Sequence, residues 1–184
     1  VSDFAACEAM AKAVKDRFGT IDVLVNNAGI TKDGLLVQMS EEQFDVVTRV
    51  NYKSVFNMMR HVGKIMIRQR SGRIINITSV AGLYGNPGQM NYSASKAAVI
   101  GLTRALAKEM GPSGIRVNCI APGVIDTDMN ARLSTDDMAA LAGETPLCRI
   151  GTPEEAAEAI FYLASDKARF ITGAVLNVNG GIVI

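Results

Sequence analysis

The stretch from Arg73 to Lys96 reads RIINITSVAGLYGNPGQMNYSASK and contains the two patterns that decide the fold. Its first five residues form a short β-branched run, which predicts a buried strand. From Tyr92 onward the sequence becomes rich in Ala and Leu, and this helical pattern ends at Gly111-Pro112. A strand followed by a long helix indicates one repeating unit of an α/β fold.

The same alternation continues on both sides of this stretch. Three further β-branched runs are apolar throughout, as in parallel strands that are covered on both faces; they span residues 22–26, 115–120 and 174–178. Apolar spacing, a stop at Gly19 and capping boxes beginning at Ser40 and Thr152 predict further helices, at residues 4–18, 40–67 and about 152–164. Strands and helices in this order predict a doubly wound parallel sheet of the α/β class.

Composition fits one globular domain over residues 1–184, because 48% of the residues are hydrophobic and 20% are charged. A net charge of +1, with no basic stripe, argues against nucleic-acid and membrane-surface partners. No apolar run approaches the roughly 18 residues that a membrane span needs. The single histidine, His61, has no Cys or carboxylate cluster near it in the sequence, so we expect no metal site.

Cysteine usage bears on the cellular compartment. Cys7, Cys119 and Cys148 are widely spaced, which indicates reduced thiols and a cytoplasmic location. The chain opens at Val1 without an initiator Met, so removal of a targeting segment, such as a plastid transit peptide, stays an open alternative.

Ligands of such sheets bind beyond the carboxyl ends of the strands, and polar or glycine-containing segments follow three of the predicted strands. These segments are Asn26-Asn27-Ala28-Gly29, Thr78-Ser79 and Ala121-Pro122-Gly123. Tyr92 and Lys96 are four residues apart and therefore share one face of a helix. A nearby ammonium group favours the phenolate and lowers a tyrosine pKa from its usual value of about 10.

Each of these residues also has an ordinary structural interpretation. Tyr92 and Lys96 are also compatible with an exposed pair on an amphipathic helix, and Ser79 with a simple turn residue. Asn51 interrupts a helical stretch, where a solvent-facing or locally bonded side chain is the usual explanation. Tyr92 alone among the four tyrosines has a lysine four residues later. The occurrence of this pair together with Ser79 and Asn51 is what points to catalysis.

These motifs, in this order and spacing, resemble the short-chain dehydrogenase/reductase family over Val1 to Gly181. The resemblance implies a three-layer, Rossmann-type fold in which Tyr92 donates a proton to a carbonyl oxygen that Ser79 holds. It further implies that Lys96 binds the nicotinamide ribose and lowers the Tyr92 pKa, and that Asn51 holds a relay water. The cofactor-binding residues that it implies are Val1, Asn27, Ala28, Gly29, Tyr92, Lys96, Pro122, Gly123, Ile125 and Thr127.

Within the family, four segments are most similar to 3-oxoacyl-[acyl-carrier-protein] reductases; they are residues 73–77, 85–92, 125–129 and 171–181. This similarity implies NADPH-dependent reduction of a 3-oxoacyl thioester in fatty acid biosynthesis, on acyl carrier protein or CoA, by a homotetramer. The alternatives are a reductase or dehydrogenase acting on acetoacetyl-CoA or another carbonyl or alcohol, and an inactive fragment or scaffold. The segment from Met129 to about Leu147 resembles the mobile substrate lid of the family.

The chain departs from the family pattern at its start. No Thr-Gly-x-x-x-Gly-x-Gly loop is present, so we expect that about sixty residues of an N-terminal region are missing from a fragment. That loop and its helix supply the pyrophosphate site, and the following strand selects NAD or NADP. Without the first strand of the family, we expect the strand at residues 22–26 to have an open edge.

Overall fold

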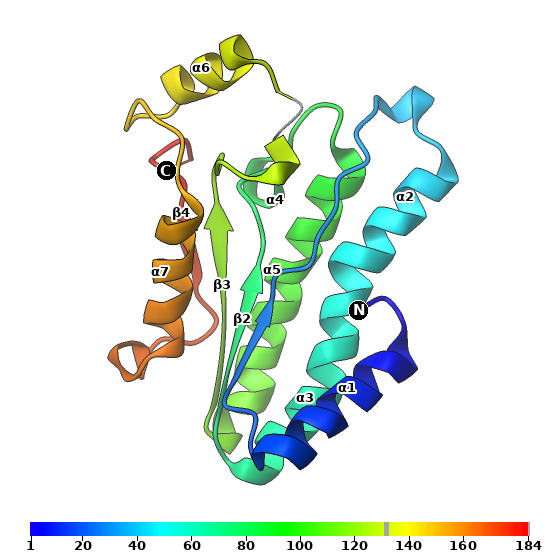
Figure 1. The fold of residues 1–184 in the computed structure, drawn as a ribbon, viewed down its shortest axis with the longest axis vertical. Helices are drawn as coiled ribbons and strands as arrows, with labels where there is room; N and C mark the ends of the chain where they lie inside the picture. The colour runs from blue at the N-terminus through cyan, green and yellow to red at the C-terminus, as the bar shows by residue number, and fades with distance from the viewer. Residues whose placement is uncertain (131–132, 184) are drawn as a thin grey trace.

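A computed structural model describes residues 1–130 and 133–183 and contains one parallel sheet, whose strands follow the chain order (Figure 1). The strands are β1 (Val23–Asn26), β2 (Gly72–Ile77), β3 (Ile115–Pro122) and β4 (Val175–Val178). Neighbouring strands pair in parallel with register Leu24 to Ile74 and Ile74 to Val117. The four predicted strands and the parallel α/β class are therefore confirmed.

Helices cover both faces of this sheet, which makes three layers (Figure 1). The α-helices are α1 (Phe4–Phe18), α2 (Glu41–Thr48), α3 (Ser54–Gln69), α4 (Ala81–Tyr84), α5 (Met90–Met110), α6 (Thr135–Glu144) and α7 (Pro153–Ala164). Short 3-10 segments span Leu36–Gln38, Gly111–Ser113, Asp128–Asn130 and Asp166–Ala168. The apolar sides of α1, α3 and α5 pack together on one face, and α7 packs on the other.

Most helix ends follow the capping signals of the sequence. Gly19 ends α1 with a φ of 79°, in the left-handed region that glycine adopts without strain. The boxes that begin at Ser40 and Thr152 cap α2 and α7 as predicted. The sequence analysis missed α6, which lies inside the expected lid and begins with a third box, Ser134 with Asp137. Residues 131–132 of that lid lie outside the described residues.

The helical stretch after Ser40 differs from the prediction of one continuous helix to Ile67. Between α2 and α3 the chain makes a π-helical turn, Arg49–Lys53, and α3 then continues to Gln69. A π-turn inserts one extra residue per turn and is found most often at functional sites. Asn51 lies in this turn and is only 1% exposed.

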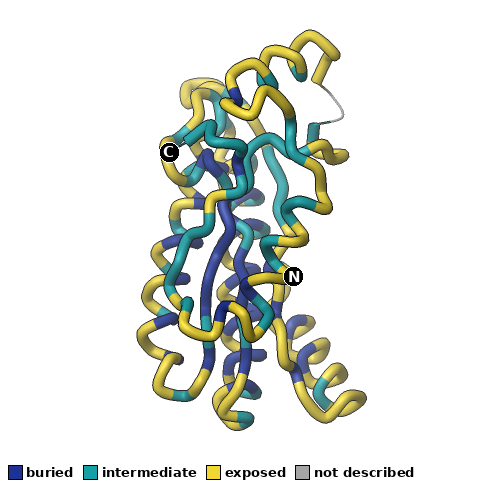
Figure 2. The backbone as a smooth tube through the Cα atoms, turned by 90° about the vertical axis from the view of Figure 1, so that its left-hand side faces the viewer, coloured by how far each residue is buried: buried dark blue, intermediate teal, exposed yellow. Residues whose placement is uncertain are grey.

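The central strands β2 and β3 are buried between two apolar clusters, as the buried central segments in Figure 2 indicate. One polar chain crosses the larger cluster: Asn26 Nδ2 donates to Asn76 Oδ1 at 2.8 Å, and Asn76 Nδ2 donates to Thr103 Oγ1 at 2.9 Å. Buried amides stay favourable only when they are hydrogen-bonded. These bonds therefore fasten β1 to β2 and β2 to α5.

The outer strand β1 is less buried than predicted. Its side chains alternate, with Leu24 and Asn26 buried while Val23 and Val25 are 41% and 40% exposed. Among the described residues, β1 pairs with β2 alone, and α7 packs against β2, β3 and β4. The expectation of full cover on both faces was therefore wrong for β1, whereas its expected open edge is confirmed.

Helix α3 carries apolar residues around more of its surface than contact with the sheet requires, and the structure gives a different reason for them than the sequence suggested. More apolar residues than one helix face needs for packing on its own sheet predict a surface for another subunit, formed by Val55, Phe56, Met58, Met59, Val62, Ile65 and Met66. In the structure Val55, Met58, Met59, Val62 and Met66 are all buried within the chain. They are buried because α3 packs against α1 as well as against the sheet. Phe56 is the large apolar side chain from that predicted surface that stays exposed, at 47%.

The three cysteines differ in their exposure. Cys7 and Cys119 are buried and Cys148 is exposed, all as free thiols. Within residues 1–130 and 133–183, no group of three His, Cys, Asp or Glu side chains is arranged to hold a metal ion. In the same residues, no helix combines the length and apolar character of a membrane span.

Gly82 in α4 makes the tightest approach to the helix that bears Tyr92. A Cβ atom at Gly82 would lie 2.8 Å from the backbone C of Lys96 and 2.9 Å from the backbone N of Ala97. We predict that Gly82→Ala lowers the free energy of unfolding by about 1–3 kcal/mol, because α4 must move away from α5.

Urea denaturation measures this change, with Gly143→Ala as the matched control. Gly143 also lies in a helix, but apart from its chain neighbours and the backbone of its own helix, no described atom lies within 4 Å of its Cβ position. The control substitution should raise stability by about 0.5 kcal/mol through reduced chain entropy. Equal stability of the two variants would contradict the close packing of α4 on α5.

Candidate active site

The predicted catalytic residues come together at the carboxyl edge of the sheet. Ser79 follows β2, Tyr92 and Lys96 lie in the first turns of α5, and Asn51 lies in the π-turn. The backbone of Gly29, after β1, closes the group: a Cβ there would lie 3.4 Å from Lys96 Nζ and 3.6 Å from Asn51 Oδ1. Five residues from four segments thus meet at one point.

Lys96 is the buried charge of the site. Its side chain is 4% exposed, and its Nζ donates to the carbonyl oxygen of Ile77 at 2.8 Å. Burial lowers the pKa of Lys96 from 10.5 to about 8, because the ammonium form loses hydration. The Thr78 hydroxyl donates to the Lys96 carbonyl oxygen at 2.8 Å, so β2 holds both ends of this residue.

Tyr92 is also buried, with 9% of its surface exposed. Burial raises its pKa above 10.0, the interaction with the Ser79 hydroxyl lowers it, and the negative charge of Asp33 raises it. The prediction that Lys96 lowers the Tyr92 pKa is therefore not met in this structure. The Lys96 Nζ lies 5.6 Å from the centroid of the Tyr92 ring and is bonded to Ile77 instead.

Ser79 is half-buried at the start of the α4 segment. Its Oγ accepts a hydrogen bond from the backbone N–H of Ala81 at 3.2 Å, and the hydroxyl interacts with Tyr92. A hydroxyl has one proton to donate in addition to its acceptor sites. Ser79 and Tyr92 can therefore both donate to one carbonyl oxygen placed between them.

Asn51 is neither solvent-facing nor locally bonded, the two structural alternatives for it. Its Oδ1 accepts from the Ile30 N–H at 2.8 Å, and its Nδ2 donates to the Ile30 carbonyl oxygen at 2.9 Å and to Ser95 Oγ at 3.2 Å. The Oδ1 atom retains one lone pair. Asn51 thus joins the loop after β1 to α5.

Three of the residues expected to bind the cofactor lie together beside β1. Val1, Asn27 and Ala28 line a cavity of about 130 Å³ beside β1. The Val1 carbonyl oxygen accepts from Asn57 Nδ2 at 3.1 Å, which fixes the start of the chain on α3. This cavity opens on the same strand whose outer edge is unpaired.

The expected cofactor-binding residues at and after the end of β3 differ from one another in which way they face and in how far they are exposed. Pro122 and Gly123 end β3, and a Cβ at Gly123 would lie 2.9 Å from Asn179 Cα, so glycine is required for this approach. Ile125 instead turns toward Gly151: its Cδ1 would lie 2.7 Å from a Cβ there. Thr127 is exposed, and its hydroxyl donates to the Ile125 carbonyl oxygen at 3.5 Å.

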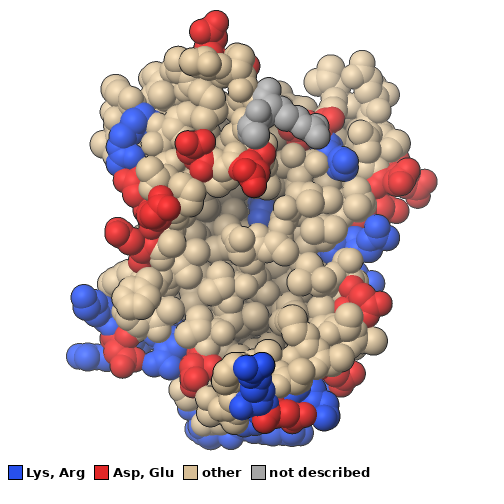
Figure 3. Space-filling view, viewed as in Figure 1, with Lys and Arg blue, Asp and Glu red and all other residues tan. Residues whose placement is uncertain are grey.

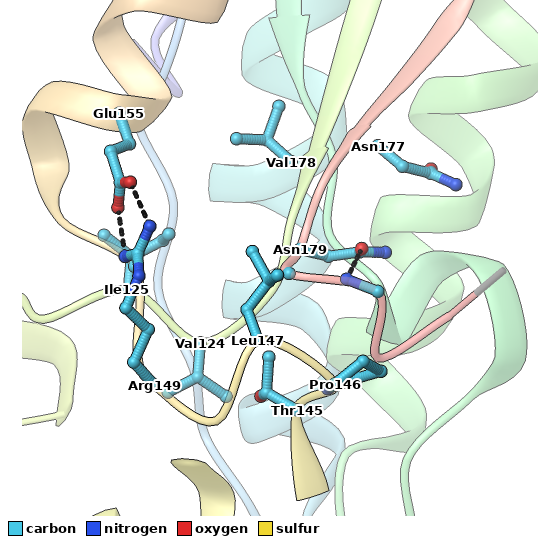
Figure 4. A pocket seen from close by; sticks show the side chains of 13 residues that line it. Val124, Ile125, Thr145, Pro146, Leu147, Arg149, Glu155, Asn177, Val178 and Asn179 are labelled. Atoms are coloured by element: carbon cyan, nitrogen blue, oxygen red, sulfur yellow. Dashed lines mark hydrogen bonds and ion pairs between the residues drawn. The ribbon is translucent and has the colours of Figure 1, made fainter.

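Ile125 lines a second cavity of about 490 Å³, between α7 and the C-terminal segment (Figure 4). The ion pair of Arg149 with Glu155, in which both carboxylate oxygens are bonded, closes one side of it. Ser79, Tyr92 and Lys96 do not line this cavity. The larger cavity therefore lies apart from the catalytic group, which itself faces the sheet edge.

A nicotinamide cofactor fits one part of this edge. Because Gly29 has no side chain, the space beside Lys96 Nζ and Asn51 Oδ1 stays open for a ribose; a Cβ there would be in van der Waals contact with both atoms. Figure 3 shows a hollow on this face whose walls are mostly uncharged, with basic surface at its floor. No glycine-rich phosphate loop occurs in the sequence, so the fit concerns the nicotinamide half alone.

Sequence reasoning gave no role to Asn91, which precedes Tyr92 and is completely buried. Its Oδ1 accepts from the Tyr92 N–H at 2.7 Å, and its Nδ2 donates to the Lys32 carbonyl oxygen at 3.0 Å. The only signal in the sequence was a polar residue at the start of a helix, which predicts a cap and no more. The long-range contact follows from the fold.

Known proteins match the chain over nearly its whole length. Residues 1–183 match the family model described as enoyl-(acyl carrier protein) reductase. The chain is 50% identical over 184 residues to a 3-oxoacyl-[acyl-carrier-protein] reductase of Thermotoga maritima, a match that covers 100% of the chain and 75% of that protein. Proteins of the same name from Staphylococcus epidermidis and Staphylococcus aureus are 51% and 49% identical over 173 and 182 residues.

These two matches cover 94% and 99% of the chain, and 71% and 74% of the respective relatives. The matched length includes the strands, the helices and the candidate catalytic residues. The likeness therefore concerns the whole described fold and not one motif. The chain belongs to the short-chain dehydrogenase/reductase family of nicotinamide-dependent oxidoreductases.

Proposed function

We propose that the protein reduces a 3-oxoacyl thioester, carried by acyl carrier protein, to the 3-hydroxyacyl form with NADPH in fatty acid biosynthesis. The observation that carries this proposal is the buried group of Ser79, Tyr92 and Lys96 at the carboxyl edge of the sheet. The names of relatives that are about half identical over the whole chain support the substrate class. NADPH is the proposed cofactor on the family resemblance.

The proposed roles follow from the hydroxyl and amine groups of the site. Ser79 and Tyr92 donate hydrogen bonds to the ketone oxygen and polarise its carbonyl group. A bound nicotinamide supplies the hydride, and Tyr92 gives its proton to the oxygen that becomes a hydroxyl. A tyrosine with a raised pKa is protonated at neutral pH and is ready to donate. Lys96, with a pKa of about 8, can exchange a proton near that pH.

Asn51 completes the proposed proton path. Its Oδ1 lies beside Gly29 and Lys96 and has a free lone pair. We propose that this atom holds a water molecule which returns a proton to Lys96 from solvent. Pro122, Gly123 and Thr127 are proposed to contact the nicotinamide end, and Ile125 to contribute through its backbone, because its side chain faces Gly151.

The matched family description names reduction of a carbon–carbon double bond, whereas the relatives are named for ketone reduction. Two hydroxyl donors aimed at one oxygen favour the ketone. Assays with 3-oxoacyl and 2-enoyl groups on carrier protein, with acetoacetyl-CoA and with cyclic alcohols separate these activities. Failure to reduce the acyl groups with NADPH, together with failure to oxidise the alcohols with NADP⁺, would favour the scaffold interpretation.

We predict that Tyr92→Phe in the intact protein removes more than about 99% of turnover, because a positioned proton donor contributes a factor of 10² to 10⁴. Cofactor affinity should stay nearly unchanged, since only a hydroxyl is lost. Steady-state kinetics and fluorescence titration measure both quantities. Tyr84→Phe is the matched control, as Tyr84 is 56% exposed. A loss below about tenfold would remove Tyr92 from the proposed role.

We further predict that Lys96→Met abolishes activity but stabilises the fold by about 2 kcal/mol at pH 7. Burial lowers the pKa of this lysine to about 8, so relief of a charge penalty of about 3 kcal/mol exceeds the loss of one hydrogen bond, about 1 kcal/mol.

The advantage of Lys96→Met should shrink as the pH rises from 8 to 10.5. In that window the unfolded parent binds a proton that the folded parent has released, so parent stability rises with pH. Urea denaturation at pH 7 and pH 10 measures the difference. A variant that is less stable than the parent at pH 7 would show that Lys96 is not held at a desolvation cost.

We also propose a homotetramer that assembles through α5, the side of α3 that carries the exposed Phe56, and the C-terminal segment. Ile184 of that segment lies outside the described residues. Support comes from the exposed small residues along one side of α5, namely Ala94, Ala97, Gly101 and Ala105. A Cβ at Gly101 would meet no atom within 4 Å, so another helix can approach closely there.

Light scattering at micromolar concentration should give a tetramer for the intact protein, and Gly101→Arg should reduce its mass, because a long charged side chain blocks helix approach. Gly143→Arg, also in a helix, is the control and should stay tetrameric. A monomeric parent would refute the assembly. A dimeric parent would mean that only one of the two proposed helical surfaces forms a subunit interface.

A further inference from the structure

The first turn of α5 is fastened by one completely buried side chain, Asn91. The residue before the helix, Gln89, makes no capping bond with its side chain. Asn91 Oδ1 instead accepts from the Tyr92 N–H at 2.7 Å. The N–H groups of a first helical turn have no partner within the helix, so this bond satisfies a donor that belongs to the catalytic residue itself.

The other end of the Asn91 side chain reaches two further segments. Its Nδ2 donates to the Lys32 carbonyl oxygen at 3.0 Å and to the Gln43 carbonyl oxygen at 3.3 Å. Lys32 is in the loop after β1, and Gln43 is in the first turn of α2. One amide group thus joins the Tyr92 backbone to two elements that are distant in the sequence.

The loop that receives Asn91 is itself held at both ends. Asn51 bonds the N–H and the carbonyl group of Ile30. Gly34 N–H donates to the Gly88 carbonyl oxygen at 2.8 Å, and Gln89 Nε2 donates to Asp33 Oδ2 at 2.9 Å. Asn91 therefore anchors Tyr92 to a rigid support that the proposed catalytic Asn51 also holds.

We propose that Asn91 is a positioning residue, which fixes the depth of the Tyr92 hydroxyl relative to Ser79. The inference rests on the proposed reductase function. Without the Asn91 amide, the first turn of α5 loses its only side-chain links to Lys32 and Gln43 among the described residues. A displacement of about 1 Å at a reacting group costs about 100-fold in rate.

A second asparagine gives a matched control. Asn118 in β3 is 1% exposed; its Nδ2 donates to the Ile171 carbonyl oxygen at 2.9 Å, and its Oδ1 accepts from the Ala174 N–H at 3.0 Å. It thus resembles Asn91 in burial and bonding but lies outside the catalytic group. Its replacement by Ala tests what a lost structural amide does alone.

The experiment compares Asn91→Ala and Asn118→Ala in the intact protein with NADPH and a 3-oxoacyl thioester. Both variants should lower the urea midpoint. Only Asn91→Ala should lower kcat, by about 100-fold, with an unchanged KM for NADPH and an increased solvent isotope effect on kcat, because proton transfer becomes slower. Asn91→Ser retains an acceptor for the Tyr92 N–H but is too short to reach Lys32, and it should lose more than about tenfold.

A kcat within about twofold of the parent for either soluble Asn91 variant would overturn the proposal, as would an equal loss in Asn118→Ala. If the parent reduces no thioester, the proposed function is wrong. The positioning role of Asn91 is then tested by a measurement that does not require turnover. NMR titration of ¹³C-labelled tyrosine, assigned with Tyr92→Phe, follows the Tyr92 hydroxyl directly.

The charged groups that face this hydroxyl are Lys96 on its own helix and Asp33 in the loop, beside the neutral Ser79. Loosening of the first turn admits water and relieves the burial that raises the Tyr92 pKa. The titration midpoint should therefore fall in Asn91→Ala and stay unchanged in Asn118→Ala. An unchanged midpoint in both variants would contradict a positioning role.

Discussion

The structure depends on the burial of one ammonium group at the end of β2. Among the described residues, the Lys96 ammonium has one hydrogen-bond acceptor, the Ile77 carbonyl oxygen, and the backbone of Gly82 approaches the same residue unusually closely. Gly82 permits the approach of α4 to the backbone and Cβ of Lys96, where an added Cβ would lie 2.8 Å away, and Gly29 lies beside the Nζ, where an added Cβ would be in ordinary contact at 3.4 Å. The strand end, α4 and the loop after β1 are thus arranged around a charge that is costly to bury. A cost of this kind is expected where function requires it.

Much of the fold could be predicted from the sequence, because strand, helix and capping signals agree with one another. Gly19 and the boxes at Ser40 and Thr152 define helix ends through local bonds alone, which is why they were predictable. The exposure of Val23 and Val25 was not predictable, since an apolar run does not reveal which neighbours cover it. The width of α3 was misjudged for the same reason: contact with α1 is tertiary information.

The candidate catalytic residues were predicted from the spacing of their motifs, but the directions in which their pKa values are shifted were not predicted. The helical spacing of four residues places Tyr92 beside Lys96, yet burial has the largest effect on both pKa values: it raises that of Tyr92 and lowers that of Lys96. The π-turn at Asn51 leaves no clear trace in the sequence, because it depends on partners in the loop after β1 and in α5. Asn91 was overlooked for a similar reason, because its side-chain amide donates to carbonyl groups of segments that are distant in the sequence.

The most direct test of the account is the pKa of Lys96 itself, followed by the ¹³Cε chemical shift of labelled lysine across a pH titration of the folded protein. Assignment against Lys96→Met isolates its signal from those of the exposed lysines. A buried ammonium with one carbonyl partner should titrate at about 8. A midpoint at 10.5, the ordinary lysine value, would show that the ammonium is hydrated and would contradict the central claim.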